Sequence, residues 1–195
     1  DRHYYFSHML NCLYDCRYCF LQGMYRSSNF VLFVNYEDFV SDIRAVASSY
    51  PNEQCIFFSG YDCDSLALEG LTGFANHFLD LFQNLPNATL ELRTKSVNVS
   101  PLLQREALEN VVVAFTLSPD PVAKSLEFKA PTLSARLRAI AKLASAGWKI
   151  GLRFDPLIYF DNCQQVYRAF IDETLEQIPL SAIHSATIGV FRSPK

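Results

Sequence analysis

Several features that would point to a membrane, a secreted scaffold or nucleic acid are missing from this sequence. No apolar run reaches the roughly 18–20 residues needed to span a bilayer, and the N-terminus has no signal-peptide pattern. The formal net charge is -3, so no overall basic field advertises nucleic-acid binding. The six cysteines are too sparse for a disulfide scaffold in a chain of 195 residues. These absences favour a protein of the reducing cytoplasm.

What is present is a regular alternation of apolar runs with helix-like stretches. Residues 55–59 and 111–117 are apolar runs typical of buried strands, and residues 36–49 and 132–146 have helical spacing. Five strand–helix pairs and a sixth strand imply parallel βαβ units. The other predicted helices cover residues 71–82, 100–109 and 163–178, and the other strands cover residues 4–7, 89–94, 149–154 and 184–190.

The alternation predicts an α/β fold, a partial (β/α)6 barrel that forms one domain over residues 1–195. A flat doubly wound sheet is the competing geometry. In a barrel, the active site lies at the C-terminal ends of the strands. Because the sequence begins without Met and in the middle of a domain-like pattern, we expect it to be a piece of a longer chain.

Three cysteines are crowded into one short segment, with the spacing C-x3-C-x2-C at Cys12, Cys16 and Cys19. Three thiolates this close are unfavourable unless a metal compensates their charge. No fourth cysteine lies nearby, so a zinc site with four cysteine ligands is not set up. Three ligands on a four-iron cluster leave one iron open. The spacing favours iron–sulfur; zinc completed by His3 or His8, and a chance grouping of thiols, are the alternatives.

This segment resembles the cluster loop of the radical S-adenosylmethionine (SAM) superfamily, which follows the first barrel strand and has an aromatic residue near the last cysteine. Tyr18 is that residue here. The resemblance implies that Cys12, Cys16 and Cys19 hold a 4Fe–4S cluster whose open iron binds SAM. Reductive cleavage of SAM then gives a 5′-deoxyadenosyl radical, and a reductant protein of the flavodoxin or ferredoxin type would supply the electron.

Over residues 5–159 the chain is similar to one branch, the spore photoproduct lyase-like family. Each matching motif is weak alone, but their order and spacing together are specific. The matching segments are CRYCFLQ at 16–22, SGYDCD at 59–64, RTK at 93–95, TLSPD at 116–120 with Glu127, the helix at 136–147 and RFDPLIY at 153–159.

The family resemblance also implies a SAM-binding set. Lys95 would pair with the SAM carboxylate, since a cation at a strand end suits that anion. Ser59, Gly60 and Asp62 would line the side of the SAM amino group, with Gly60 allowing close backbone approach. Ser118 would reach the ribose or the carboxylate. The alternatives are a solvated strand end for Lys95 and an ordinary turn for Gly60.

The sequence departs from the family at the hydrogen-donor route. In lyases that repair the spore photoproduct, a cysteine after the second strand donates a hydrogen atom, and two tyrosines beside the last cluster cysteine form a relay. Tyr61 occupies the donor position, with Cys63 two residues later. Tyr18 retains one relay position, but Phe20 replaces the other. The candidate catalytic residues are therefore Cys63, Tyr61 and Tyr18, although Cys63 as a simple buried thiol is an open alternative.

The resemblance implies a lyase that abstracts hydrogen from a thymine photoproduct in DNA, flipped out of the duplex into the barrel mouth. The C-terminal segment is not basic, which gives that substrate no support. A second hypothesis keeps the radical chemistry and changes the substrate to a nucleotide or another small molecule. A third is a non-catalytic iron–sulfur or zinc domain that binds a partner.

Overall fold

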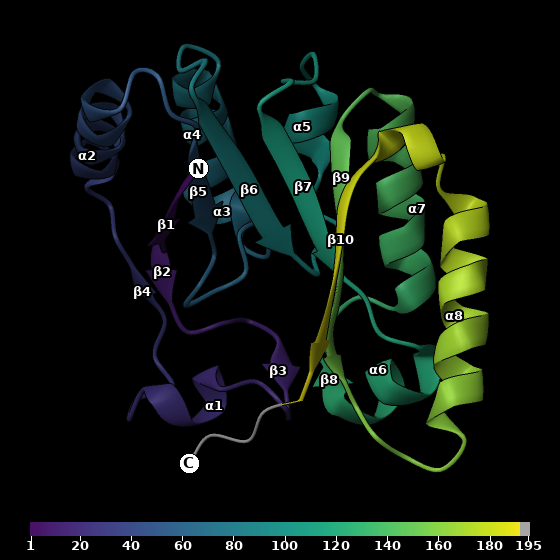
Figure 1. Ribbon diagram of the computed structural model, residues 1–195. Helices are drawn as coiled ribbons and strands as arrows, with labels where there is room; N and C mark the ends of the chain where they lie inside the picture. The colour runs from purple at the N-terminus through teal and green to yellow at the C-terminus, as the bar shows by residue number, and fades with distance from the viewer. Residues whose placement is uncertain (192–195) are drawn as a thin grey trace.

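The computed structural model describes residues 1–191 and contains an open, curled sheet of parallel strands (Figure 1). Every hydrogen-bonded pair of neighbours in this sheet is parallel. The predicted partial (β/α)6 barrel is confirmed. In spatial order the six strands are β1 (Arg2–Phe6), β5 (Cys55–Ser59), β6 (Ala88–Thr94), β7 (Val111–Thr116), β9 (Lys149–Leu157) and β10 (Ile183–Val190).

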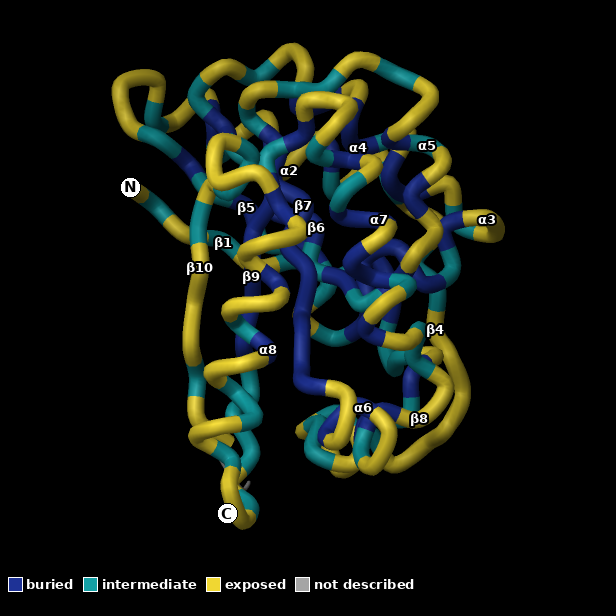
Figure 2. Tube along the Cα trace, turned by 90° about the vertical axis from the view of Figure 1, so that its right-hand side faces the viewer, coloured by how far each residue is buried: buried dark blue, intermediate teal, exposed yellow. Residues whose placement is uncertain are grey.

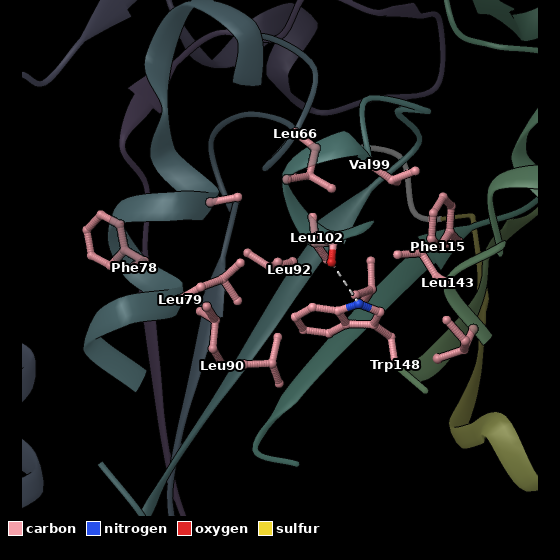
Figure 3. Packing of buried hydrophobic residues seen from close by; sticks show 14 of the residues in the cluster. Leu66, Phe78, Leu79, Leu90, Leu92, Val99, Leu102, Phe115, Leu143 and Trp148 are labelled. Carbon is pink, nitrogen blue, oxygen red and sulfur yellow. Dashed lines mark hydrogen bonds between the residues drawn. The ribbon is translucent and has the colours of Figure 1, made fainter. Parts of the chain in front are cut away.

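Helices in the crossovers pack against one face of this sheet (Figure 1). The hydrophobic core lies between the two layers. Trp148 is fully buried there, and its indole Nε1 donates a hydrogen bond of 3.1 Å to the carbonyl of Leu102 (Figure 3). The long helices are α2 (Tyr36–Ser49), α4 (Phe74–Phe82), α7 (Leu133–Ser145) and α8 (Cys163–Gln177).

Two predicted helices differ from the structure. The helix predicted at residues 71–82 is divided into α3 (Glu69–Thr72) and α4, because Gly73 between them has φ +58° and ends the first segment. The helix predicted at residues 100–109 ends early, as α5 (Ser100–Leu103). The chain turns at Leu108, whose carbonyl accepts from Val111 N, and so enters β7 directly.

Two short antiparallel ladders, which periodicity did not predict, lie outside the main sheet. The first joins β2 (Met9–Leu10) to β4 (Val31–Leu32). The second joins β3 (Asp15–Cys16) to β8 (Glu127–Phe128) and follows α6 (Asp120–Leu126). The second ladder places the cysteine segment at the end of the sheet where the strand arrows point, with α1 (Leu21–Met24) beside it (Figure 1).

The distribution of burial follows these layers. Figure 2 shows the central strands as mostly buried, whereas the edge strand β10 and much of α8 are exposed. Among residues 1–191, no helix is both long and apolar enough to cross a membrane.

Candidate active site

A cavity of about 820 Å³ opens at the C-terminal ends of the parallel strands. Its wall includes residues from the ends of β5, β6, β7, β9 and β10, the position at which parallel barrels carry their active sites. Cys12, Cys16 and Cys19 all line it. The fold therefore brings the cysteine segment and the strand ends to one place.

The three thiols are free and partly or fully buried. Burial raises the pKa of Cys12 to about 12 and that of Cys16 to about 11. Thiolates at these positions therefore require a nearby positive charge, which an iron–sulfur cluster supplies to its ligands. Three cysteine sulfurs from one loop are the donor set that such a cluster takes; in the described residues they line one cavity without forming a group placed to hold a metal ion. Neither His3 nor His8 belongs to the described residues that line the cavity.

The buried carboxylate of Glu127 anchors the cysteine segment. Cys16 pairs with Glu127 in the β3–β8 ladder. Glu127 accepts hydrogen bonds from the Tyr18 hydroxyl, from Ser118 Oγ at 2.9 Å and from the Arg136 guanidinium. Burial opposes its charge, but the positive charges of Lys95 and Arg136 hold the pKa of Glu127 below its usual range. We call Tyr18, Ser118, Glu127 and Arg136 the Glu127 network.

This network defines the position of two predicted site residues. Tyr18 lines the cavity with its ring while its hydroxyl is engaged by Glu127. Ser118 is 1% exposed, donates to Glu127, and does not belong to the described cavity wall. The predicted contact of Ser118 with SAM stays a prediction.

A second buried carboxylate, which sequence reasoning missed, joins the turn after β5 to the end of β6. Asp64 lines the cavity and accepts from Thr94 Oγ1 and Lys95 N, both at 2.6 Å, and from Leu66 N at 3.0 Å. Its burial raises the pKa of the carboxyl, against the effect of these hydrogen bonds. Asp62, the predicted residue, lies behind the described wall, and its backbone N donates to Ser7 Oγ.

The remaining predicted SAM contacts line the cavity. Ser59 Oγ donates to the carbonyl of Glu91 at 2.9 Å and lies 2.7 Å from Ser65 Oγ. Gly60 has φ +76°, and a Cβ added there would lie 2.6 Å from Ser65 Oγ. A glycine is therefore required for this turn to close against Ser65. Lys95 lines the cavity with its Nζ 5.5 Å from the centre of the Tyr18 ring.

The two donor candidates differ sharply in environment. Cys63 is 7% exposed, and its Sγ lies 3.8 Å from Nδ1 of His8. The His8 ring stacks on Phe74 with centroids 3.9 Å apart, and burial lowers the pKa of His8 to about 4. Burial also raises the pKa of the Cys63 thiol, which keeps it protonated. Tyr61, by contrast, is 53% exposed.

Charged side chains also line the cavity floor. The Arg153 guanidinium pairs with Glu91 through contacts of 2.6 and 3.2 Å, and both side chains are buried. Arg93 and Asp155 lie 3.4 Å apart and are each about 40% exposed. Arg153 is therefore saturated by its carboxylate partner, whereas Arg93 retains access to the cavity.

A six-stranded half-barrel with three thiols of one loop at its mouth is the core of a radical SAM protein. A solved structure of a hexahistidine-tagged protein, anSMEcpe, with bound AdoMet has this fold (TM-score 0.67, 14% identity, covering 100% of this chain and 51% of that one). The chain belongs to the spore photoproduct lyase family, whose model matches residues 3–192.

Relatives within that family cover nearly all of the chain. Spore photoproduct lyase of Bacillus subtilis (strain 168) is 23% identical over 186 residues, which are 93% of this chain and 53% of that protein. The lyase of Geobacillus sp. (strain Y412MC61) is 24% identical and covers 86% of this chain and 49% of its own length. The chain thus spans about half the length of these curated relatives.

The structural agreement is high at low identity. A spore photoproduct lyase mutant with bound AdoMet and dinucleoside spore photoproduct has a TM-score of 0.89, with 22% identity, 97% coverage of this chain and 56% of its own. At this identity the likeness establishes the fold.

Proposed function

We propose that this protein is a radical SAM enzyme of the lyase type that acts on a thymine photoproduct in DNA. The observation that carries the proposal is that three free thiols from one loop line the same cavity as Ser59 and Lys95. Membership of the spore photoproduct lyase family supports the substrate class. All six cysteines are free, which suits the cytoplasm.

In this proposal Cys12, Cys16 and Cys19 are the ligands of a 4Fe–4S cluster. A cluster held there would supply the one-electron reduction of SAM to methionine and a 5′-deoxyadenosyl radical, with the electron coming from the reductant protein. Lys95 binds the SAM carboxylate as a charge-assisted partner. Ser59 and Gly60 line the side of the SAM amino group.

Two buried carboxylates act as positioning groups. Asp64 fixes Lys95 through the backbone N–H at the end of β6, and Glu127, itself bound by Ser118, fixes the cysteine loop through Tyr18 and the pairing with Cys16. We place Asp62 with these supports, since its backbone N–H donates to Ser7.

Cys63 is the better placed hydrogen-atom donor. Cys63 lines the cavity, and burial raises the pKa of its thiol, which favours the S–H form that can give a hydrogen atom. Tyr61 also lines the cavity but is largely solvated, and Tyr18 has its hydroxyl bound to Glu127. The substrate radical would take one hydrogen atom from the Cys63 S–H bond.

The proposal is tested by three measurements on anaerobically reconstituted protein. We expect a reducible 4Fe–4S cluster, release of 5′-deoxyadenosine with SAM and dithionite, and conversion of a dinucleotide spore photoproduct to two thymines. Cys16→Ala should abolish all three, with Cys55→Ala as the matched control outside the cavity. Stoichiometric zinc in place of iron would overturn the proposal, as would 5′-deoxyadenosine release by Cys16→Ala.

Radical chemistry on a nucleotide or another small molecule is the second candidate. It is favoured by the departures from the family at Tyr61 and Phe20, which replace a donor cysteine and a relay tyrosine. Intact SAM cleavage without restored thymines would favour it. In either case we propose a flavodoxin- or ferredoxin-type reductant as partner, and for the lyase also DNA with a flipped-out lesion.

A further inference from the structure

Four aromatic side chains form a continuous strip along one side of the cavity. Tyr5 on the edge strand β1 stacks on Phe58 of β5, with centroids 5.1 Å apart. Tyr61 meets the Tyr5 ring at 5.5 Å in an edge-on arrangement, and Phe20 meets Tyr61 at 5.7 Å. All four line the cavity that holds the cluster cysteines. We call Tyr5, Phe58, Tyr61 and Phe20 the aromatic strip.

The strip is exposed to an unusual degree for rings that line a concave site. Tyr5 is 62% exposed, Tyr61 53% and Phe20 45%, whereas Phe74 and Phe78 in the core are fully buried. Large apolar surfaces left open in a cavity typically mark contact with a ligand. The faces left free are flat and aromatic, so they match a planar ring better than an aliphatic chain.

The charges in the same cavity narrow the choice of ligand. Arg153 is saturated by Glu91, but Arg93 is about 40% exposed and its contact with Asp155 is long, at 3.4 Å. A partly exposed cation in the same cavity as exposed rings suits a planar base attached to a phosphate. This combination is how proteins hold unpaired nucleotides, with bases on aromatic faces and cations on the backbone.

We propose that the aromatic strip is a stacking platform for an unpaired nucleobase of the substrate strand. The inference rests on the proposed function and adds to it a base-binding surface specific to this chain. Tyr61 supplies a ring where the family's lyases have a hydrogen-donating cysteine, so the position contributes stacking here. The adenine of SAM is the competing occupant.

Fluorescence anisotropy on the cluster-loaded protein tests this without any turnover. The probes are a labelled short thymidine oligonucleotide and a labelled abasic oligomer with the same number of phosphates. Because stacking on an aromatic ring strengthens binding by roughly 5- to 150-fold per base, we expect wild type to prefer the thymidine probe by at least about 10-fold. Tyr61→Ala and Tyr5→Ala should each lose most of that preference and leave binding of the abasic probe unchanged.

Two controls complete the experiment. Tyr61→Phe keeps the ring and should keep the preference. Tyr159→Ala removes an aromatic ring that is 88% exposed but outside the described cavity wall. It should leave the binding of both probes unchanged. Equal binding of the two probes by wild type would overturn the inference. So would Tyr61→Ala weakening SAM binding, measured by equilibrium dialysis, while the thymidine preference persists. The probe ratio stays measurable even if no 5′-deoxyadenosine is formed, so failure of the proposed function is seen separately.

Discussion

Tyr18 and Phe20 flank the last cluster cysteine and face opposite environments. The Tyr18 hydroxyl donates to Glu127 in the Glu127 network, where the carboxylate and the Arg136 guanidinium are buried and hydrogen-bonded. Phe20 joins the aromatic strip, where the rings touch one another and solvent. The same short loop is therefore fixed on one side by buried charge and left open on the other. The contrast indicates that the buried side serves the geometry of the cluster loop and the open side serves a ligand.

The largest effect on the free energy of unfolding is expected from disrupting the Glu127 network. Glu127→Ala should lower the free energy of unfolding by about 3–5 kcal/mol, because it leaves the Arg136 guanidinium buried without its carboxylate. Urea denaturation followed by circular dichroism measures this. Asp80→Ala removes the carboxylate of an ion pair with Arg105, with the aspartate 76% exposed, and should cost only about 0–1 kcal/mol. Equal losses in the two variants would contradict the contrast between buried and exposed charge.

Much of the fold follows from local sequence signals. The strand at 55–59 and the helix at 36–49 have their predicted bounds, since the first is an unbroken apolar run and the second keeps helical spacing over its full length. The predicted end of the helix at 100–109 is wrong because the helix stops where the chain must turn to enter β7. Sequence periodicity carries no information on that tertiary constraint. The β3–β8 ladder has two residues per strand, too few to give any period.

The candidate site likewise divides into residues that local motifs predict and residues that only tertiary contacts bring together. The thiols, Gly60 and Lys95 were found because they lie in motifs, and the structure places all of them at the cavity. Asp64 and Glu127 act through partners that lie 31 and 109 residues away in the sequence, Lys95 and Tyr18. Such pairings are set by the crossover topology and leave no local pattern. The aromatic strip as a whole leaves no local pattern either, because β1, β5 with the turn after it and the residue before α1 bring its rings together only in the fold.

An intermediate effect on stability is expected from His8, whose ring stacks on Phe74 and lies against Cys63. Its folded-state pKa of about 4 lies below the usual value of 6.5, so the native state keeps it neutral. As the pH falls from about 6.5 to about 4, His8 becomes protonated in the unfolded chain but stays neutral in the folded chain. The free energy of unfolding therefore falls by about 3 kcal/mol. Above pH 6.5 the group contributes no pH dependence.

The measurement is the free energy of unfolding of wild type and His8→Phe from pH 7.5 to pH 4. The difference between the two curves should shrink or reverse as the pH falls, since the phenylalanine ring can stack on Phe74 without titrating. Parallel curves would show that His8 is protonated in the native state and that its ring is more open to solvent than the packing indicates.

The smallest effect on stability is expected at the aromatic strip. This prediction tests most directly the contrast between the strip and the buried Glu127 network. Tyr61→Ala removes a side chain that is 53% exposed and whose contacts are with other exposed rings, so the free energy of unfolding should change by less than about 1 kcal/mol. Phe78→Ala, at a fully buried ring, should cost about 3–5 kcal/mol in the same urea experiment. A loss above about 2 kcal/mol for Tyr61→Ala would mean that the strip is part of the packed structure. A near-neutral result leaves ligand contact as the reason for placing these rings in water beside the cluster loop.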